Sequence, residues 1–180
     1  KGATVDGWEA AQNALQASFE GLTLVECHFH AMLKLSQHLA TYKRQRKKAG
    51  QPVTEAEESA IRTAFWQVLK APTPEAYQQA LEQLPEVFGQ EPLASRKQSL
   101  IEKQALFQAW TTDHNLVVVT TALDQCFKFL NRKLENMQTF HSKESGLATV
   151  NAWAITRNCW RFLKGAKRAG LSPLELGGGD

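Results

Sequence analysis

The sequence has few cysteines, no long apolar run and none of the common phosphate-loop or nucleophile motifs. Its three cysteines are an odd number, and no signal-like apolar segment is present, which argues against a disulfide framework and favours a reducing compartment. No stretch reaches the about 18 apolar residues of a membrane span. A glycine-rich phosphate loop, a paired Cys-x-x-Cys and a serine–histidine–acid combination are also absent, so the sequence carries no signature of those sites.

The composition is that of a folded chain with unevenly placed charge. Apolar residues make up 43% of it, enough for the core of one domain or of one large piece of a domain. The net charge is only +3, but residues 43–48 contain five bases (Lys43, Arg44, Arg46, Lys47 and Lys48) and residues 157–168 contain no acid. Such clusters suit a polyanion better than the total charge suggests. A solvated helix end is the plainer interpretation of residues 43–48.

Periodicity and capping signals predict a mainly α-helical chain with one or two short strands, an α+β arrangement. The predicted strands end at about residue 5 and cover about residues 22–27. The predicted helices cover about residues 8–20, 29–42, 55–70, 74–85, 94–110 and 122–138, with a last long helix that begins after Ser142. Thr54 with Glu57 reads as a capping box, and Thr73 as an N-cap before a proline. The last helix is apolar nearly all round, so we expect it to be central.

The rest of the chain is organised around the helix predicted at about residues 122–138. Its apolar residues recur at helical spacing (Leu123, Phe127, Leu130, Leu134 and Met137) and indicate one buried side. Thr121 and Asp124 resemble a capping box, which predicts a helix start near Ala122. Lys128 follows Asp124 by one turn, after the extended-looking residues 116–119, and this pairing could hold a carboxylate at the edge of a site. An acid that only serves the helix dipole is the plainer interpretation.

Two further groups lie at predicted strand ends. Asp6 precedes Gly7 at the end of the first strand, where α/β sheets present catalytic carboxylates, although an aspartate before glycine can simply be a turn residue. Cys27 and His30 lie at a strand-to-helix junction and could ligate zinc. A closed zinc site needs four such groups, however, and the other cysteines and histidines form no second pair. A buried Cys27 with a hydrogen-bonded His30 is the alternative.

Together these features form a pattern. Asp6-Gly7-Trp8, a helix to Phe19, and Val25 to His30 with its cysteine-x-x-histidine resemble the second-aspartate block of DDE/D-type transposases of bacterial insertion sequences. The stretch from Val119 to Asp124, followed by residues 130–134 and 140–142, is similar to the segment that bears the third acid in that family. Residues 151–162 and 171–176 resemble the C-terminal helix and tail.

The resemblance implies the second half of a ribonuclease H-like catalytic domain with an all-helical insertion. Residues 1–42 would be a strand-helix-strand-helix portion of the core, 43–115 the insertion, and 116–180 the acidic core helix with the C-terminal helices. Asp6 and Asp124, with Glu135 as the fallback third acid, would be catalytic and would hold Mg²⁺ or Mn²⁺ in a two-metal site. The first aspartate of the family belongs on an earlier strand, so we expect this chain alone to cut no DNA.

The resemblance also implies partners. These are double-stranded DNA, both element ends and target, and further copies of the chain in an oligomeric complex, without a membrane, in the bacterial cytoplasm at the nucleoid. The bases of residues 43–48 would bind the phosphate backbone, and Lys128, Arg132 and Lys133 would hold DNA near the active centre. The alternative is a non-catalytic helical DNA-binding or assembly module, a domesticated transposase remnant. A helical bundle that binds no nucleic acid is the third interpretation.

Overall fold

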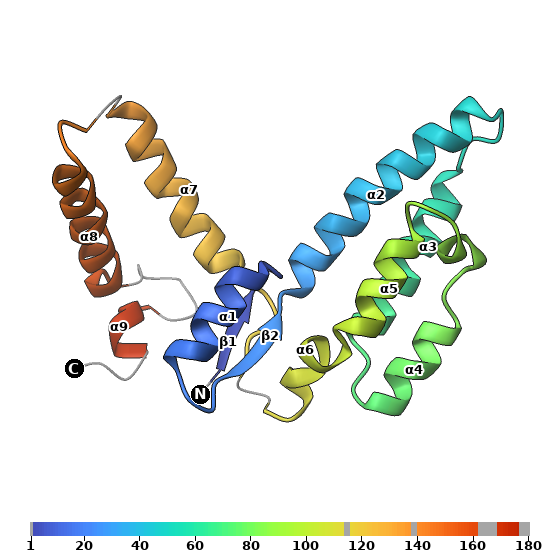
Figure 1. Cartoon of the computed structure of the whole chain (residues 1–180), viewed down its shortest axis with the longest axis horizontal. Coiled ribbons are helices and arrows are strands. Elements are labelled where there is room, and N and C mark those ends of the chain that lie inside the picture. The colour runs from blue at the N-terminus through green and yellow to red at the C-terminus, as the bar shows by residue number, and fades with distance from the viewer. Residues whose placement is uncertain (1, 114–115, 138–139, 162–168, 177–180) are drawn as a thin grey trace. The chain divides into compact units, whose positions relative to one another are not determined.

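The computed structural model describes residues 2–113, 116–137, 140–161 and 169–176, and for residues 121–126 and 176 it describes the backbone alone. The chain forms two compact units, Lys1–Ala122 and Leu123–Asp180. The described residues are mainly helical, with one sheet of two parallel strands, which confirms the predicted mainly helical class (Figure 1). Among those residues, no helix combines the length and the apolar character needed to cross a bilayer.

The first unit opens with a strand-helix-strand segment. β1 (Gly2–Val5) and β2 (Thr23–Glu26) pair in parallel, with Gly2 opposite Thr23 and Val5 opposite Glu26. Parallel neighbours need a crossover connection, and α1 (Glu9–Ser18) supplies it (Figure 1). Both strands and this helix lie within two residues of their predicted ends.

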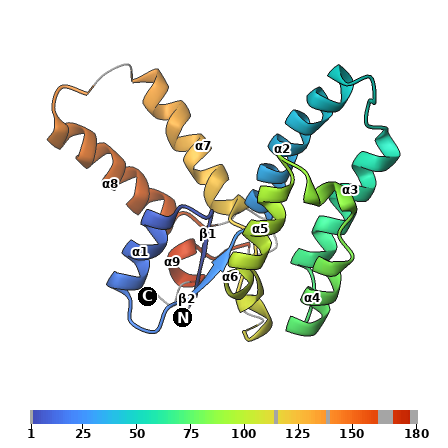
Figure 2. The ribbon, with the colours of Figure 1, turned by 45° about the vertical axis from the view of Figure 1, so that its right-hand side comes forward.

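Helices make up the rest of the first unit and contain its apolar core. These elements are α2 (His28–Lys48), α3 (Glu55–Leu69), α4 (Pro74–Glu82), η1 (Glu86–Gly89), α5 (Ala94–Glu102), α6 (Gln104–Gln108) and η2 (Ala109–Thr111). α3 packs against both α2 and α4 (Figure 2). The residues of α3 that were predicted to face inward are all buried: Ile61, Phe65, Val68 and Leu69. The predicted capping box of Thr54 with Glu57 and the predicted N-cap of Thr73 are confirmed.

Two helix predictions in this unit are wrong. The helix expected to stop at Tyr42 continues to Lys48, because lysine, arginine and glutamine are good helix formers whether or not they are buried. It ends before Gly50, whose φ of 75° breaks the helix. The helix expected at residues 94–110 is interrupted at Lys103, where φ is −107° and ψ is 18°. The break divides it into α5 and α6, and the Lys103 ammonium reaches Glu26 of β2.

The second unit contains three described helices. They are α7 (Thr121–Asn136), which begins at the junction of the units, α8 (Lys143–Cys159) and α9 (Pro173–Leu176). α7 starts within one residue of the predicted position, and the side chains of the predicted capping box, Thr121 and Asp124, lie outside the described residues. Of the apolar residues predicted on its buried side, Leu130 is buried, whereas Phe127 and Met137 are exposed.

α8 differs most from its prediction. Ser142 caps it as expected and accepts a hydrogen bond from the Ser145 amide at 3.1 Å. No residue of α8 is buried, however, and Leu147 and Ile155 are largely exposed, so the prediction of a central helix is wrong. Polar residues such as Asn151, Thr156 and Asn158 interrupt its apolar surface, so the helix is not apolar all round and has less to gain from a central position.

The three-part division into residues 1–42, 43–115 and 116–180 stays a prediction. The described residues between 43 and 113 form helices and the segments that connect them and contain no strand, as an all-helical insertion requires. The boundary at residue 43 lies inside α2.

Candidate functional site

The carboxyl ends of the two parallel strands bring two candidate residues to one edge of the sheet. Val5 and Glu26 are paired, so Asp6 and Cys27 each come directly after a strand at that edge. The Cys27 amide donates a hydrogen bond to the Val5 carbonyl at 2.7 Å, which extends the pairing by one step. This edge is where parallel sheets commonly bind ligands.

Asp6 forms a turn and keeps its carboxylate exposed. One carboxylate oxygen, Oδ1, accepts a hydrogen bond from the Trp8 amide at 3.1 Å, and the next residue, Gly7, has a φ of 86°. The turn-residue interpretation is therefore correct for the local structure. A Cβ at Gly7 would lie 2.3 Å from Oε1 of Glu26, so a larger residue here would clash as well as strain the backbone.

Glu26 is a buried carboxylate beside this turn that the sequence analysis missed. Its side chain is 4% exposed and pairs with the Lys103 ammonium at 3.0 Å. The Gln12 amide nitrogen, from the buried side of α1, donates to Glu26 Oε2 at 3.3 Å. The only signal in the sequence was an acid at the end of an otherwise apolar strand. Glu26 thus links β2 to α1 and to the break between α5 and α6.

Residues 116–120 run beside β1 and the start of α2, although they form no strand themselves. The Thr4 hydroxyl donates to the Val117 carbonyl, and the His28 amide donates to the Val118 carbonyl at 2.9 Å. The segment predicted to be extended therefore connects β1 with the start of α2. Thr120 ends it, directly before α7.

Cys27, His30 and Thr120 form a cluster that we call the threonine clamp. The Thr120 amide and hydroxyl lie 3.3 and 3.4 Å from the Cys27 sulfur and donate to it. The same hydroxyl is 3.3 Å from Nδ1 of His30. Cys27 is fully buried, so the prediction of a buried cysteine with a hydrogen-bonded histidine is confirmed. Among the described residues, no three histidine, cysteine or acidic side chains group as a metal site would require.

His28 is a second buried group that sequence reasoning overlooked. Its Nε2 lies 3.1 Å from the Phe107 carbonyl oxygen, and its ring packs near those of Trp66, Phe107 and Trp110. Burial lowers the pKa of His28, and the hydrogen bond with Phe107 opposes that shift in part. The Cys-His-Phe-His sequence did not distinguish the two histidines, but α2 directs His28 into the helical core and His30 toward the clamp.

The candidate acids of α7 are only partly described. The Asp124 side chain lies outside the described residues, and so does any comparison of its position with that of Asp6. Glu135, Lys128, Arg132 and Lys133 are exposed on α7. An exposed carboxylate such as Asp6 is the hard oxygen ligand that Mg²⁺ prefers, so this residue fits the implied metal.

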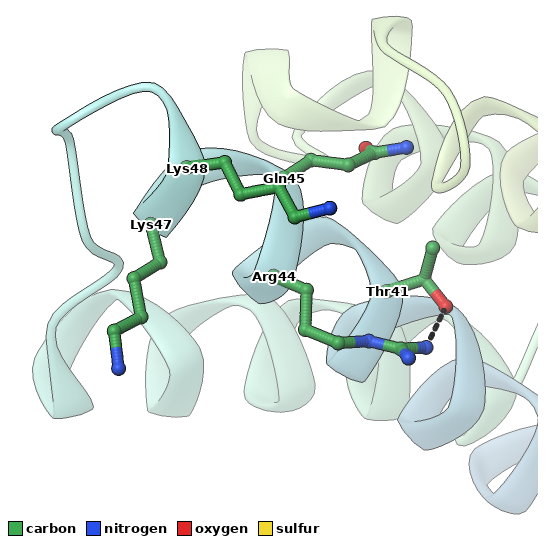
Figure 3. A pocket seen from close by; sticks show the side chains of 5 residues that line it. All are labelled: Thr41, Arg44, Gln45, Lys47 and Lys48. Carbon is green, nitrogen blue, oxygen red and sulfur yellow. Dashed lines mark hydrogen bonds between the residues drawn. The ribbon is translucent and has the colours of Figure 1, made fainter.

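The basic run at the end of α2 divides into two sets. Lys43 forms an ion pair with Glu58 of α3, and Arg46 is half-buried where it lines a cavity of about 130 Å³ with Val53 and Glu57. The prediction that nothing buries these bases is therefore wrong for Arg46, whereas Lys43 is ion-paired but exposed. The other three, Arg44, Lys47 and Lys48, line an open depression of about 610 Å³ with Thr41 and Gln45 (Figure 3).

Two acids of α3, Glu57 and Glu58, have pKa values below the ordinary value of a glutamate. Hydrogen bonds from Lys43, and then from Arg62, lower the pKa of Glu58. Hydrogen bonds from Thr54 lower the pKa of Glu57, and the charge of Arg46 makes a smaller contribution.

Comparisons of the chain with protein-family models, with curated proteins and with solved structures found no match.

Proposed function

We propose that this chain carries part of the catalytic domain of a DDE/D-type DNA transposase. Asp6 and Asp124 would be catalytic acids, with Glu135 as the fallback for Asp124. The observation that carries the proposal is the threonine clamp. It holds Thr120, which precedes Asp124 by four residues in the sequence, against Cys27, the residue that follows β2 at the sheet edge where Asp6 follows β1.

The chemistry gives a reason for acids in these places. Phosphodiester cleavage and strand transfer need carboxylates from separate elements to hold Mg²⁺ or Mn²⁺, which activates the attacking oxygen and stabilises the leaving one. The parallel β1-α1-β2 segment is compatible with a ribonuclease H-like core that contains a helical insertion. Gly7 and Glu26 would keep the Asp6 turn in place. The partner would be double-stranded DNA, bound by an oligomer of the chain.

The test is a strand-transfer assay with Mg²⁺ or Mn²⁺ on the whole natural protein that contains this chain. We expect Asp6→Asn and Asp124→Asn each to abolish strand transfer, because an amide is a weaker metal ligand than a carboxylate. Glu20→Gln, a change of an exposed acid in the loop after α1, is the matched control and should leave the rate unchanged. Circular dichroism should show intact folding in all three variants.

A non-catalytic DNA-binding or assembly module is the second candidate. Two observations favour it: the Asp6 carboxylate already serves a turn, and Arg44, Lys47 and Lys48 on α2 form no ion pair with any residue that the structure describes. In that case Asp6→Asn would leave every DNA-dependent activity intact. Retained strand transfer in the Asp6→Asn protein would therefore exclude the catalytic proposal.

A further inference from the structure

Five lining residues define an exposed surface at the C-terminal end of α2, which we call the α2 tip: Thr41, Arg44, Gln45, Lys47 and Lys48 (Figure 3). Thr41, Arg44, Gln45 and Lys48 follow helical spacing and share one side of α2, and Lys47 borders it. Figure 3 shows the Arg44 guanidinium turned back along the helix, where Nη2 donates to the Thr41 hydroxyl at 3.1 Å.

The opposite side of α2 has a different role. Leu39 and Tyr42 are buried there, and Lys43 and Arg46 continue the same side toward the acids of α3. Lys43 is therefore paired within the fold, and Arg46 is half-buried beside Glu57, whose pKa its charge helps to lower, although no ion pair of Arg46 is found among the described residues. Among the described residues, no ion pair involves Arg44, Lys47 or Lys48.

Three neighbouring cations without acids repel one another, because bases at i, i+3 and i, i+4 on a helix raise its free energy. Because these bases lie in the last turns of α2, their favourable interaction with the helix dipole offsets part of this repulsion. A bound anionic partner would neutralise the remaining repulsion among the three bases. The Gln45 side-chain amide adds a neutral group that can donate a hydrogen bond to a phosphate oxygen.

The lining residues also indicate which polyanion fits. None is aromatic, so the surface has no platform on which unpaired bases could stack. None is a large apolar residue that could anchor in lipid. What remains is cationic and polar, which suits the regularly charged backbone of a duplex.

We propose that Arg44, Lys47 and Lys48 of the α2 tip bind the phosphate backbone of double-stranded DNA, whereas Lys43 and Arg46 only hold α2 against α3. This inference deepens the proposed function, on which it rests for the identity of the partner. It needs neither metal nor the acids Asp6 and Asp124. It divides a basic run that looks uniform in sequence into a binding set and a structural set.

Two matched variants test the division, each with two charges removed from the same helix. Binding to a short duplex of mixed sequence is measured by fluorescence anisotropy in EDTA, at salt concentrations of about 50 to 200 mM. Lys47→Gln with Lys48→Gln should flatten the slope of log affinity against log salt by about 2, since each neutralised phosphate contributes about 0.9. Adding Arg44→Gln should flatten it by about one more.

Lys43→Gln with Arg46→Gln should change that slope by less than about 0.5 and should lower the melting temperature, because its effect is on packing. Equal flattening by both pairs would overturn the division. No flattening by either pair, no duplex binding by the unmodified protein, or a preference of the tip for anionic vesicles over duplex would overturn the proposed surface. The Asp6→Asn protein should bind the duplex as the unmodified protein does. Loss of strand transfer therefore tests the catalytic proposal, and the salt dependence of duplex binding tests the α2 tip, independently of each other.

Discussion

At the scale of single residues, the buried pair of Glu26 and Lys103 has unequal members. Glu26 is 4% exposed and cannot reach water, whereas the Lys103 side chain is 30% exposed. Removing Lys103 leaves a buried carboxylate with only Gln12 as a described partner, whereas removing the charge of Glu26 leaves a lysine that can turn outward.

We therefore expect Lys103→Ala to lower the free energy of unfolding by about 2 to 3 kcal/mol, somewhat less than the loss of a fully buried partner. Glu26→Gln should cost about 1 kcal/mol. Urea denaturation measures both, with Lys48→Ala as an exposed-base control that stays within about 0.5 kcal/mol of the unmodified protein. Equal costs for the two variants would show that the pair is not asymmetric in this way.

His28 predicts a pH dependence of stability. Burial lowers its pKa in the folded protein below the ordinary value of 6.5, so below about pH 6.5 the unfolded chain binds a proton that the folded chain does not. The free energy of unfolding should then fall as the pH drops from about 6.5 to the folded pKa, by at most about 1.4 kcal/mol per pH unit for this group. Above pH 6.5 both states are neutral at His28 and its contribution is constant.

The measurement is urea denaturation at several pH values. His28→Gln should remove this part of the slope, whatever its effect on absolute stability, because glutamine does not titrate. His141→Gln, a change of an exposed histidine, is the control and should keep the slope. An unchanged slope in the His28→Gln protein would rule out His28 as its source.

At the scale of elements, the threonine clamp holds residues 116–120 beside the start of α2. Thr120→Val keeps the side-chain volume and the amide donor but removes the hydroxyl that contacts Cys27 and His30. We expect the segment to open more easily by about 1 kcal/mol, about a fivefold rise in the open population.

Two measurements follow that opening. Alkylation of buried Cys27, read by mass spectrometry, should become about fivefold faster, with exposed Cys159 as the internal reference. Exchange of the His28 amide, which is bonded to the Val118 carbonyl, should accelerate in parallel. Thr112→Val, at an exposed threonine bonded only locally to Ala109 in the described structure, should change neither rate.

At the scale of the whole molecule, the two units differ in how much apolar surface they bury. The large core cluster lies entirely in the first unit, from Ala31 to Phe107. Among the described side chains of the second unit, Leu130 and Ser172 are the buried ones. Burial of apolar side chains is the main stabilising contribution to a fold, so the units should differ in local stability.

Hydrogen exchange followed by mass spectrometry tests this difference. Amides of α3, which buries four side chains, should exchange orders of magnitude more slowly than those of α8, which buries none. Both helices have a confirmed N-cap, so capping alone would not produce the difference. Similar protection of α3 and α8 would mean that α8 gains stability from something other than burial of its described residues.

The sequence by itself determined what depends on neighbours along the chain. The capping box at Thr54, the N-caps at Thr73 and Ser142, and the inward side of α3 follow from hydrogen bonds and periodicity within about one helical turn. The two strands could be predicted from their apolar residues, and the Asp6 turn from the glycine that follows. These features depend on residues close in sequence, so they can be predicted without knowing which elements pack together.

Only the tertiary structure decided which groups meet across long separations. Lys43 and Arg46 differ from their neighbours in the basic run because α3 brings Glu58 and Glu57 to one side of α2. Glu26 meets Lys103 and Cys27 meets Thr120 only because β2 is surrounded by residues from much later in the chain. Charge and burial at these positions depend on the packing of separate elements, and spacing within one element contains no information about that packing.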